Sequence, residues 1–228
     1  METVVISGAN RGIGFELTRR FAASGCRVFA GCRTPDQATR LTELAKNADI
    51  EIRTLDVTSA DNVEALRAEL DGQTVDILIN NAGIMGHQRQ TVSDMDYDAW
   101  LRAFEVNTLA PFRMSTALRP SIARSPNPRI ATISSQMGSL NRKSKGAFAY
   151  RSSKAAVNKV MQVLAAELEA DGIIVCPIHP GWVRTDMGGP EAEISVDESA
   201  DGLFSLINKL TKEQSGRFWT WKGEEHDW

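Results

Sequence analysis

Short apolar, β-branched runs alternate with longer segments of helical periodicity along the chain. The expected strands are 3–7, 27–31, 50–55, 75–80, 129–134, 173–178 and 217–221, and the expected helices are 12–23, 36–46, 60–70, 97–118, 151–170 and 197–210. This alternation is typical of right-handed βαβ units. We therefore predict an α/β fold, a single doubly wound domain over residues 1–228 with a seven-stranded parallel sheet and helices on both faces.

Composition narrows the class of protein. A net charge of −3 gives no indication of a nucleic-acid partner. The three cysteines, Cys26, Cys32 and Cys176, are an odd number without metal-ligand spacing, which indicates a reduced protein without a metal site. The N-terminus lacks the pattern of a signal peptide, and no apolar run approaches the roughly 18 residues that span a membrane. We expect a cytoplasmic protein with no membrane contact.

A glycine-rich turn follows the first expected strand. In "VVISGANRGIGFELTRRF", the glycines are Gly8, Gly12 and Gly14. Gly8 allows the tight turn, Gly12 allows the backbone to approach a ligand, and Gly14 allows close helix–strand packing. The N-terminus of the next helix offers free N–H groups and a positive dipole end to phosphate. The turn predicts a Rossmann-type nucleotide site, although its G-x-x-x-G-x-G spacing is longer than the usual fingerprint.

The end of the second strand indicates which nucleotide binds. An acidic residue about 20 positions beyond the glycines accepts the ribose 2′-OH of NAD. Here that region holds Cys32 and Arg33, and a guanidinium suits a 2′-phosphate. Arg11 in the glycine turn could add a second positive charge. We predict NADP(H) in preference to NAD(H); the alternative is that Arg33 is an ordinary loop arginine.

The third strand ends in "TLDVT", which places Asp56 at the carboxyl edge of the sheet. Its carboxylate could accept a hydrogen bond from the adenine amino group. It could instead cap the following helix, a task for which Thr58 and Ser59 compete. The residues alone leave these alternatives open.

Tyr150 is one of only two tyrosines and precedes Lys154 by one helical turn. A tyrosine with a pKa near 10 is poorly matched to acid–base work at neutral pH, and a nearby ammonium lowers that pKa. A hydroxyl from Ser134 or Ser135, at the end of the fifth strand, could stabilise charge on the same substrate oxygen. Together these residues predict a proton-transfer site.

The motifs, taken together, resemble the short-chain dehydrogenases/reductases over essentially the whole chain. The matching segments are "SGANRGIG" (7–14), "LDV" (55–57), "NNAG" (80–83), "VN" (106–107), "ISS" (133–135), "YxxxK" (150–154) and "HPGWVRT" (179–185). The gap of 15 residues from Ser135 to Tyr150 is about two longer than in many members, which puts the substrate class in doubt but not the chemistry.

The resemblance implies a set of roles. The catalytic residues it implies are Asn107, Ser135, Tyr150 and Lys154, with Ser135 preferred to Ser134. The cofactor-binding residues it implies, together with those argued above, are Gly8, Asn10, Arg11, Gly12, Ile13, Gly14, Arg33, Asp56, Val57, Asn81, Ala82, Gly83, Tyr150, Lys154, Pro180, Gly181, Val183 and Thr185. Asn107 would anchor a water in a proton relay.

Within the family the chain looks like the branch of C-factor proteins and sniffer-like carbonyl reductases. This implies NADPH-dependent reduction of a ketone or aldehyde, a small-molecule carbonyl or alcohol substrate, and a homodimer or homotetramer joined through 97–118 and 151–170. The alternative is a C-factor-like signalling or nucleotide-sensing protein with little turnover. An epimerase would need a larger C-terminal domain. The segment 185–195 is expected to be a lid, or else a connector. His179 and the C-terminal tryptophans are expected to be structural.

Overall fold

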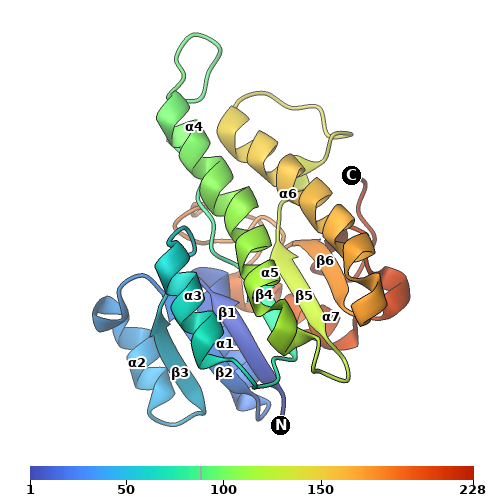
Figure 1. Cartoon of the computed structure of the whole chain (residues 1–228). Helices are drawn as coiled ribbons and strands as arrows, with labels where there is room; N and C mark the ends of the chain where they lie inside the picture. The colour runs from blue at the N-terminus through green and yellow to red at the C-terminus, as the bar shows by residue number, and fades with distance from the viewer. Residues whose placement is uncertain (88) are drawn as a thin grey trace.

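A seven-stranded, entirely parallel sheet forms the centre of the computed structural model, which describes residues 1–87 and 89–228 (Figure 1). Its strands are β1 (Thr3–Ser7), β2 (Arg27–Cys32), β3 (Ile50–Thr54), β4 (Ile77–Asn80), β5 (Arg129–Ile133), β6 (Ile174–His179) and β7 (Trp219–Thr220). Their order is β3-β2-β1-β4-β5-β6-β7. The predicted α/β class and doubly wound sheet are confirmed.

Helices cover both faces of the sheet. They are α1 (Gly12–Ala23), α2 (Thr39–Ala45), α3 (Ala60–Glu69), α4 (Tyr97–Phe104), α5 (Ala110–Ile122), α6 (Phe148–Glu167) and α7 (Val196–Lys209). Side chains of α1, α2 and α7 pack in one core cluster, and those of α3, α5 and α6 pack in the other. The sheet therefore lies between two helical layers.

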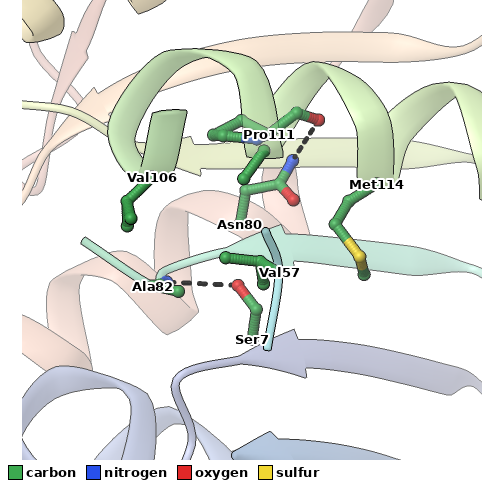
Figure 2. Close-up of a pocket in the computed structure, with 8 residues that line it drawn as sticks. Ser7, Val57, Asn80, Ala82, Val106, Pro111 and Met114 are labelled. Atoms are coloured by element: carbon green, nitrogen blue, oxygen red, sulfur yellow. Dashed lines mark hydrogen bonds between the residues drawn. The ribbon is translucent and has the colours of Figure 1, made fainter. Parts of the chain in front are cut away.

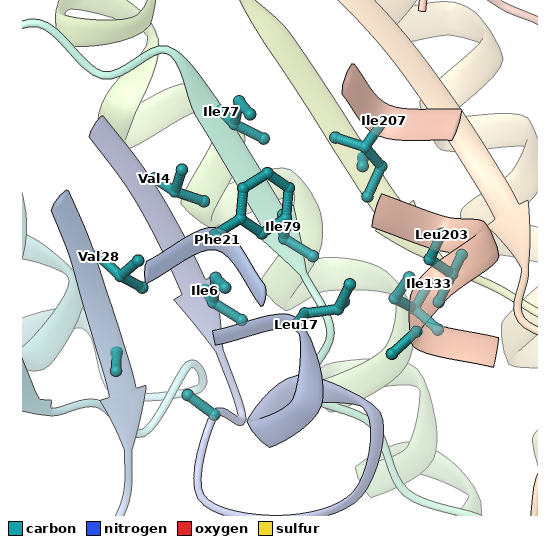
Figure 3. Packing of buried hydrophobic residues seen from close by; sticks show 14 of the residues in the cluster. Val4, Ile6, Leu17, Phe21, Val28, Ile77, Ile79, Ile133, Leu203 and Ile207 are labelled. Atoms are coloured by element: carbon teal, nitrogen blue, oxygen red, sulfur yellow. The ribbon is translucent and has the colours of Figure 1, made fainter. Parts of the chain in front are cut away.

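The two-residue period of the strands divides the core. Along β1, Val4 and Ile6 enter the first cluster while Val5 enters the second. Figure 3 shows the first cluster, where Phe21 of α1 and Leu203 of α7 lie over the strands. Because both of their faces are buried, β1, β2, β4 and β6 are apolar at most positions. The edge strand β3 instead alternates apolar and polar residues.

The expected boundaries differ at several elements. The predicted helix 97–118 is α4 and α5 joined by a π-helical turn, Glu105–Leu109. Helix α6 begins at Phe148 rather than 151, so Tyr150 lies in its first turn. Strand β7 spans two residues rather than five, because the chain turns back in a Trp219–Glu225 bridge. Among the described residues, no helix combines the length and apolar character needed to cross a bilayer.

Candidate active site

The strand order reverses between β1 and β4, and the candidate site lies at the carboxyl ends of these strands. Open α/β sheets bind ligands at this switch point. Gly8 and Gly12 adopt left-handed φ values of 68° and 52°, which a side chain would strain. A Cβ on Gly14 would lie 2.2 Å from the Gly8 carbonyl oxygen. The glycine turn is thus closely packed, and no side chain in the described part of the chain caps the N-terminus of α1.

The hydroxyl of Ser7 joins the glycine turn to the "NNAG" segment. Its Oγ accepts hydrogen bonds from the backbone N–H groups of Asn81 (3.0 Å) and Ala82 (3.1 Å). The Asn81 side chain donates in return to the carbonyl oxygens of Ser7 and Gly8, each at 3.0 Å. Figure 2 shows Ser7 pointing towards Ala82 beside a small pocket that Val57 also lines. These contacts hold together two of the segments predicted to bind cofactor.

The structure decides which residue caps α3. Ser59 is the N-cap, since its Oγ accepts from Asn62 N at 3.2 Å. One oxygen of Asp56 accepts from the N–H and hydroxyl of Thr58. These bonds, with Arg102 and Arg33 nearby, hold the pKa of Asp56 below its ordinary value. The other oxygen lies 4.0 Å from Arg102, so Asp56 remains an ionised acceptor at the sheet edge.

Arg33 follows β2 and is exposed, as expected for a residue that meets a phosphate from solvent. Arg11 is also exposed and pairs with Asp186. Asn10 and Ile13 are half-buried. The predicted phosphate cations therefore lie at the surface, and one of them already has an anionic partner on the segment after β6.

That segment runs from Pro180 across the glycine turn. Gly181 has a φ of 89°, and the chain then doubles back, with Val183 bridged to Ile194. A Cβ added to Gly12 would lie 3.4 Å from Thr185 Cγ2. The Val183–Ile194 bridge joins the two ends of the segment, and Thr185 lies against the glycine turn. The segment thus has the position expected of a lid, and its opening stays a prediction.

Asn107 lies in the π-helical turn between α4 and α5. Its side chain accepts from Ile84 N at 2.9 Å and donates to Ile84 O and to Ser153 Oγ, at 2.8 and 3.0 Å. Single π turns are common at functional sites because they change the direction of one side chain. A Cβ on Gly83 would lie 3.3 Å from Asn107 Oδ1 and 3.7 Å from Lys154 Nζ. Both polar groups thus converge beside the "NNAG" backbone.

Tyr150 and Lys154 are both buried, at 7% and 5% exposure. Lys154 Nζ donates to Ile133 O at 2.7 Å and lies 5.8 Å from the centroid of the Tyr150 ring. Burial lowers the pKa of Lys154 to about 8. Burial raises the pKa of Tyr150, and hydrogen bonding with Ser135 opposes this rise.

That Lys154 lowers the pKa of Tyr150 stays a prediction. The ammonium is held by the Ile133 carbonyl, and the loss of hydration outweighs the other influences on the phenol.

The two candidate serines point in different directions. Ser134 Oγ hydrogen-bonds to Asn158 in the core, whereas the Ser135 hydroxyl interacts with Tyr150. Ser135 Oγ also accepts from Met137 N at 3.1 Å. A Cβ on Gly138 would lie 2.6 Å from the backbone of Lys154, so the turn after Ser135 packs directly on α6. The geometry favours Ser135, as the family resemblance implied.

Other polar residues near the site have structural contacts. His179 is buried, and burial, followed by His226 and Arg142, lowers its pKa to about 3. The Trp228 ring stacks on Phe218, and its carbonyl accepts from Ser139 Oγ at 2.9 Å. The C-terminal segment thus supports the loop after Ser135, a contact that no sequence pattern indicated. The described residues contain no cluster of His, Cys, Asp and Glu able to hold a metal ion.

Gln90 is a second residue that sequence reasoning missed. It is buried, and its side-chain oxygen accepts from Ala149 N at 2.9 Å. A lone glutamine in a loop carries no recognisable pattern, so only the folded chain reveals this contact.

The fold and the site together define a nucleotide-binding oxidoreductase scaffold. Residues 2–195 match the short chain dehydrogenase family, and the chain belongs to that family. It is 41% identical to the C-signal of Myxococcus xanthus over 155 residues, which are 68% of this chain and 93% of that protein. The resemblance predicted from the motifs is confirmed.

Two solved structures are similar over the full chain. The carbonyl reductase Sniffer of D. melanogaster superposes with a TM-score of 0.95 at 30% identity, covering 100% of both chains. The NADPH-bound carbonyl reductase from chicken fatty liver gives 0.93 at 32% identity, covering 100% of this chain and 99% of that one. The predicted similarity to sniffer-like carbonyl reductases is therefore confirmed.

Proposed function

We propose that this protein is an NADP(H)-dependent carbonyl reductase acting on a small ketone or aldehyde. The observation that carries the proposal is the arrangement of Tyr150, Ser135 and Lys154 beside the switch point of the sheet. The similarity to NADPH-bound and Sniffer carbonyl reductases supports the same reaction. We propose residues 1–228 as one nucleotide-binding domain.

The chain's own groups fit NADP(H). The left-handed glycines and the uncapped N-terminus of α1 suit a diphosphate. Asp56 would accept from the adenine amino group, and Arg33 and Arg11 would bind the 2′-phosphate. Segments 81–83 and 180–185 would border the adenosine ribose and the nicotinamide. When bound, NADPH supplies the hydride for the carbonyl carbon.

The protein residues would handle the proton. The protonated Tyr150 hydroxyl would donate to the carbonyl oxygen, and its raised pKa keeps that proton in place until the oxygen becomes basic. Ser135 would donate a hydrogen bond to the same oxygen as negative charge develops. The Lys154 ammonium, whose Nζ lies 5.8 Å from the centroid of the Tyr150 ring, would favour the tyrosinate in the reverse direction. Asn107 would anchor a water that restores the proton.

Tyr150→Phe tests this function. We expect turnover of a carbonyl panel, followed by NADPH absorbance, to fall about a thousandfold, since a positioned general acid contributes about 10²–10⁴. Tyr97→Phe is the matched control, because Tyr97 is 70% exposed on α4. A Tyr150→Phe enzyme that retained most of the wild-type rate would contradict the mechanism.

The similarity to the C-signal favours a second candidate, a signalling or nucleotide-sensing protein with little turnover. Both Tyr150 and Lys154 are present, which supports turnover instead. NADPH binding without reduction of any carbonyl in the panel would support the signalling alternative.

We also propose a homodimer or homotetramer joined through α4, α5 and α6. Exposed apolar side chains lie on these helices: Tyr97, Leu101, Phe112, Phe148 and Val163. Covering such a surface would remove apolar area from water. Light scattering during size-exclusion chromatography would give the mass. A cytoplasmic location is proposed from the three free, buried cysteines.

A further inference from the structure

Helix α6 carries Tyr150 but has no local N-cap. The residue before the helix is Ala147, which has no side-chain acceptor and adopts a left-handed φ of 51°. The first backbone bond within α6 runs from Arg151 N to Ala147 O. The N–H groups of Ala149 and Tyr150, at the second and third helical positions, therefore need another acceptor.

Gln90 supplies that acceptor from a loop 59 residues away in the sequence. Its Oε1 accepts from Ala149 N at 2.9 Å and from Tyr150 N at 3.4 Å. These are the positions that an ordinary N-cap side chain serves. The Nε2 group donates to Met85 O at 3.1 Å and to His87 O at 2.6 Å. All four bonds are consistent with only one orientation of the buried amide.

The loop around Gln90 is itself anchored. Gln90 forms an antiparallel bridge with Met95, and Asp96 then caps α4 by accepting from Ala99 N at 3.0 Å. Helix α4 meets α6 a second time, where Trp100 Nε1 donates to Ser152 Oγ at 2.9 Å. The amide of Gln90 is thus held by the chain that leaves β4 while it binds the first turn of α6.

We propose that Gln90 is a positioning residue: its amide caps α6 from outside the helix and thereby sets where the Tyr150 ring lies. The proposal rests on the proposed function, because Tyr150 is its proton donor. Of the residues assigned to cofactor, Gln90 hydrogen-bonds to Tyr150, and it does so through the backbone N–H rather than the ring. Its loss should therefore lower kcat while leaving NADPH affinity nearly unchanged.

Gln90→Met tests the proposal by removing the capping oxygen at similar volume. We expect kcat to fall about tenfold or more, since a displacement near 1 Å can cost about a hundredfold, with the Kd for NADPH within about threefold of wild type. Gln90→Glu keeps the capping acceptor but loses the two bonds that Nε2 donates to Met85 O and His87 O, so it should recover only part of the lost kcat. Gln73→Met is the matched control, because Gln73 bonds to Arg27 and Glu69 O away from the site.

A second readout follows the Tyr150 phenol directly. In a Tyr97→Phe background Tyr150 is the only tyrosine, so ultraviolet titration reports its ionisation alone. The ammonium of Lys154 and the Ser135 hydroxyl face the phenol. Gln90→Glu places a negative charge against the N–H groups of Ala149 and Tyr150 and should move the ionisation to higher pH.

The outcomes separate this proposal from the proposed function. Folded Gln90→Met with kcat within twofold of wild type would overturn the positioning role. Equal losses in the Met and Glu variants, with an unmoved titration, would also overturn it. If the wild type reduced no carbonyl, the proposed function would fail. Faster amide exchange at 149–150 in Gln90→Met and the shifted titration in Gln90→Glu would then still support the cap, and their absence would refute it.

Discussion

Replacing Ser7 by alanine would remove the acceptor shared by two backbone N–H groups, those of Asn81 and Ala82. An unsatisfied buried donor costs about 1–3 kcal/mol. Asn81 and Ala82 are half-buried, and we take the lower figure for each donor. We expect Ser7→Ala to lower the free energy of unfolding by about 2 kcal/mol. For a chain of this length, that corresponds to a melting temperature lower by about 4–8 °C.

Thermal denaturation followed by circular dichroism measures this loss, and fluorescence titration with NADPH measures its effect on binding. Ser7→Thr is the matched control, because it keeps the hydroxyl that accepts from Asn81 N and Ala82 N. We expect its melting temperature to stay within about 2 °C of wild type. A Ser7→Ala protein that melted within about 1 °C of wild type, or a threonine variant that lost as much, would refute the reasoning.

Three further predictions concern charge and backbone. Arg33→Ala should weaken NADPH binding about tenfold or more, the value of a charge-assisted contact, with little change for NADH; equal losses in titrations would exclude 2′-phosphate recognition. Burial lowers the pKa of Lys154 to about 8 from 10.5. The folded-state value is the lower one, so the lysine opposes folding below pH 8, and this penalty disappears as the pH rises towards 10.5. Lys154→Met should therefore raise stability at pH 7 by about 2 kcal/mol, allowing for its lost bond to Ile133 O, and less at pH 10, as urea denaturation would show. Ala147→Val should lower stability, because a β-branched side chain is disfavoured further at a left-handed φ, whereas Ala147→Gly should be neutral or stabilising by up to about 1 kcal/mol, because it relieves the strain of the Cβ; equal stabilities in urea would contradict the strain.

The differences between the expected and observed helices have a common origin. The apolar period predicts one helix over 97–118, yet a π-helical turn interrupts it at Asn107, where the side chain binds Ile84 on the chain leaving β4. Periodicity cannot reveal such an interruption, because one extra residue in a turn leaves the apolar pattern nearly intact. The start of α6 was missed for a related reason, since its capping group comes from Gln90 rather than from the preceding residues.

Local pattern alone determined the architecture and the location of the site. Strand and helix periods, the glycines of the first turn and the four-residue spacing of Tyr150 and Lys154 act over short stretches of chain, and each restricts the backbone wherever it occurs. These patterns were sufficient to predict the parallel sheet and the edge of it at which a nucleotide is expected to bind. Together with the order of the motifs, they identified the family.

Only the tertiary structure decided what each polar group contacts. It directed Ser134 into the core and Ser135 towards Tyr150, and it bound Lys154 to a backbone carbonyl. It also brought Gln90 to a helix that begins nearly 60 residues later. Hydrogen-bond partners and burial depend on packing between segments distant in sequence, and burial in turn sets whether a phenol or an ammonium holds its proton.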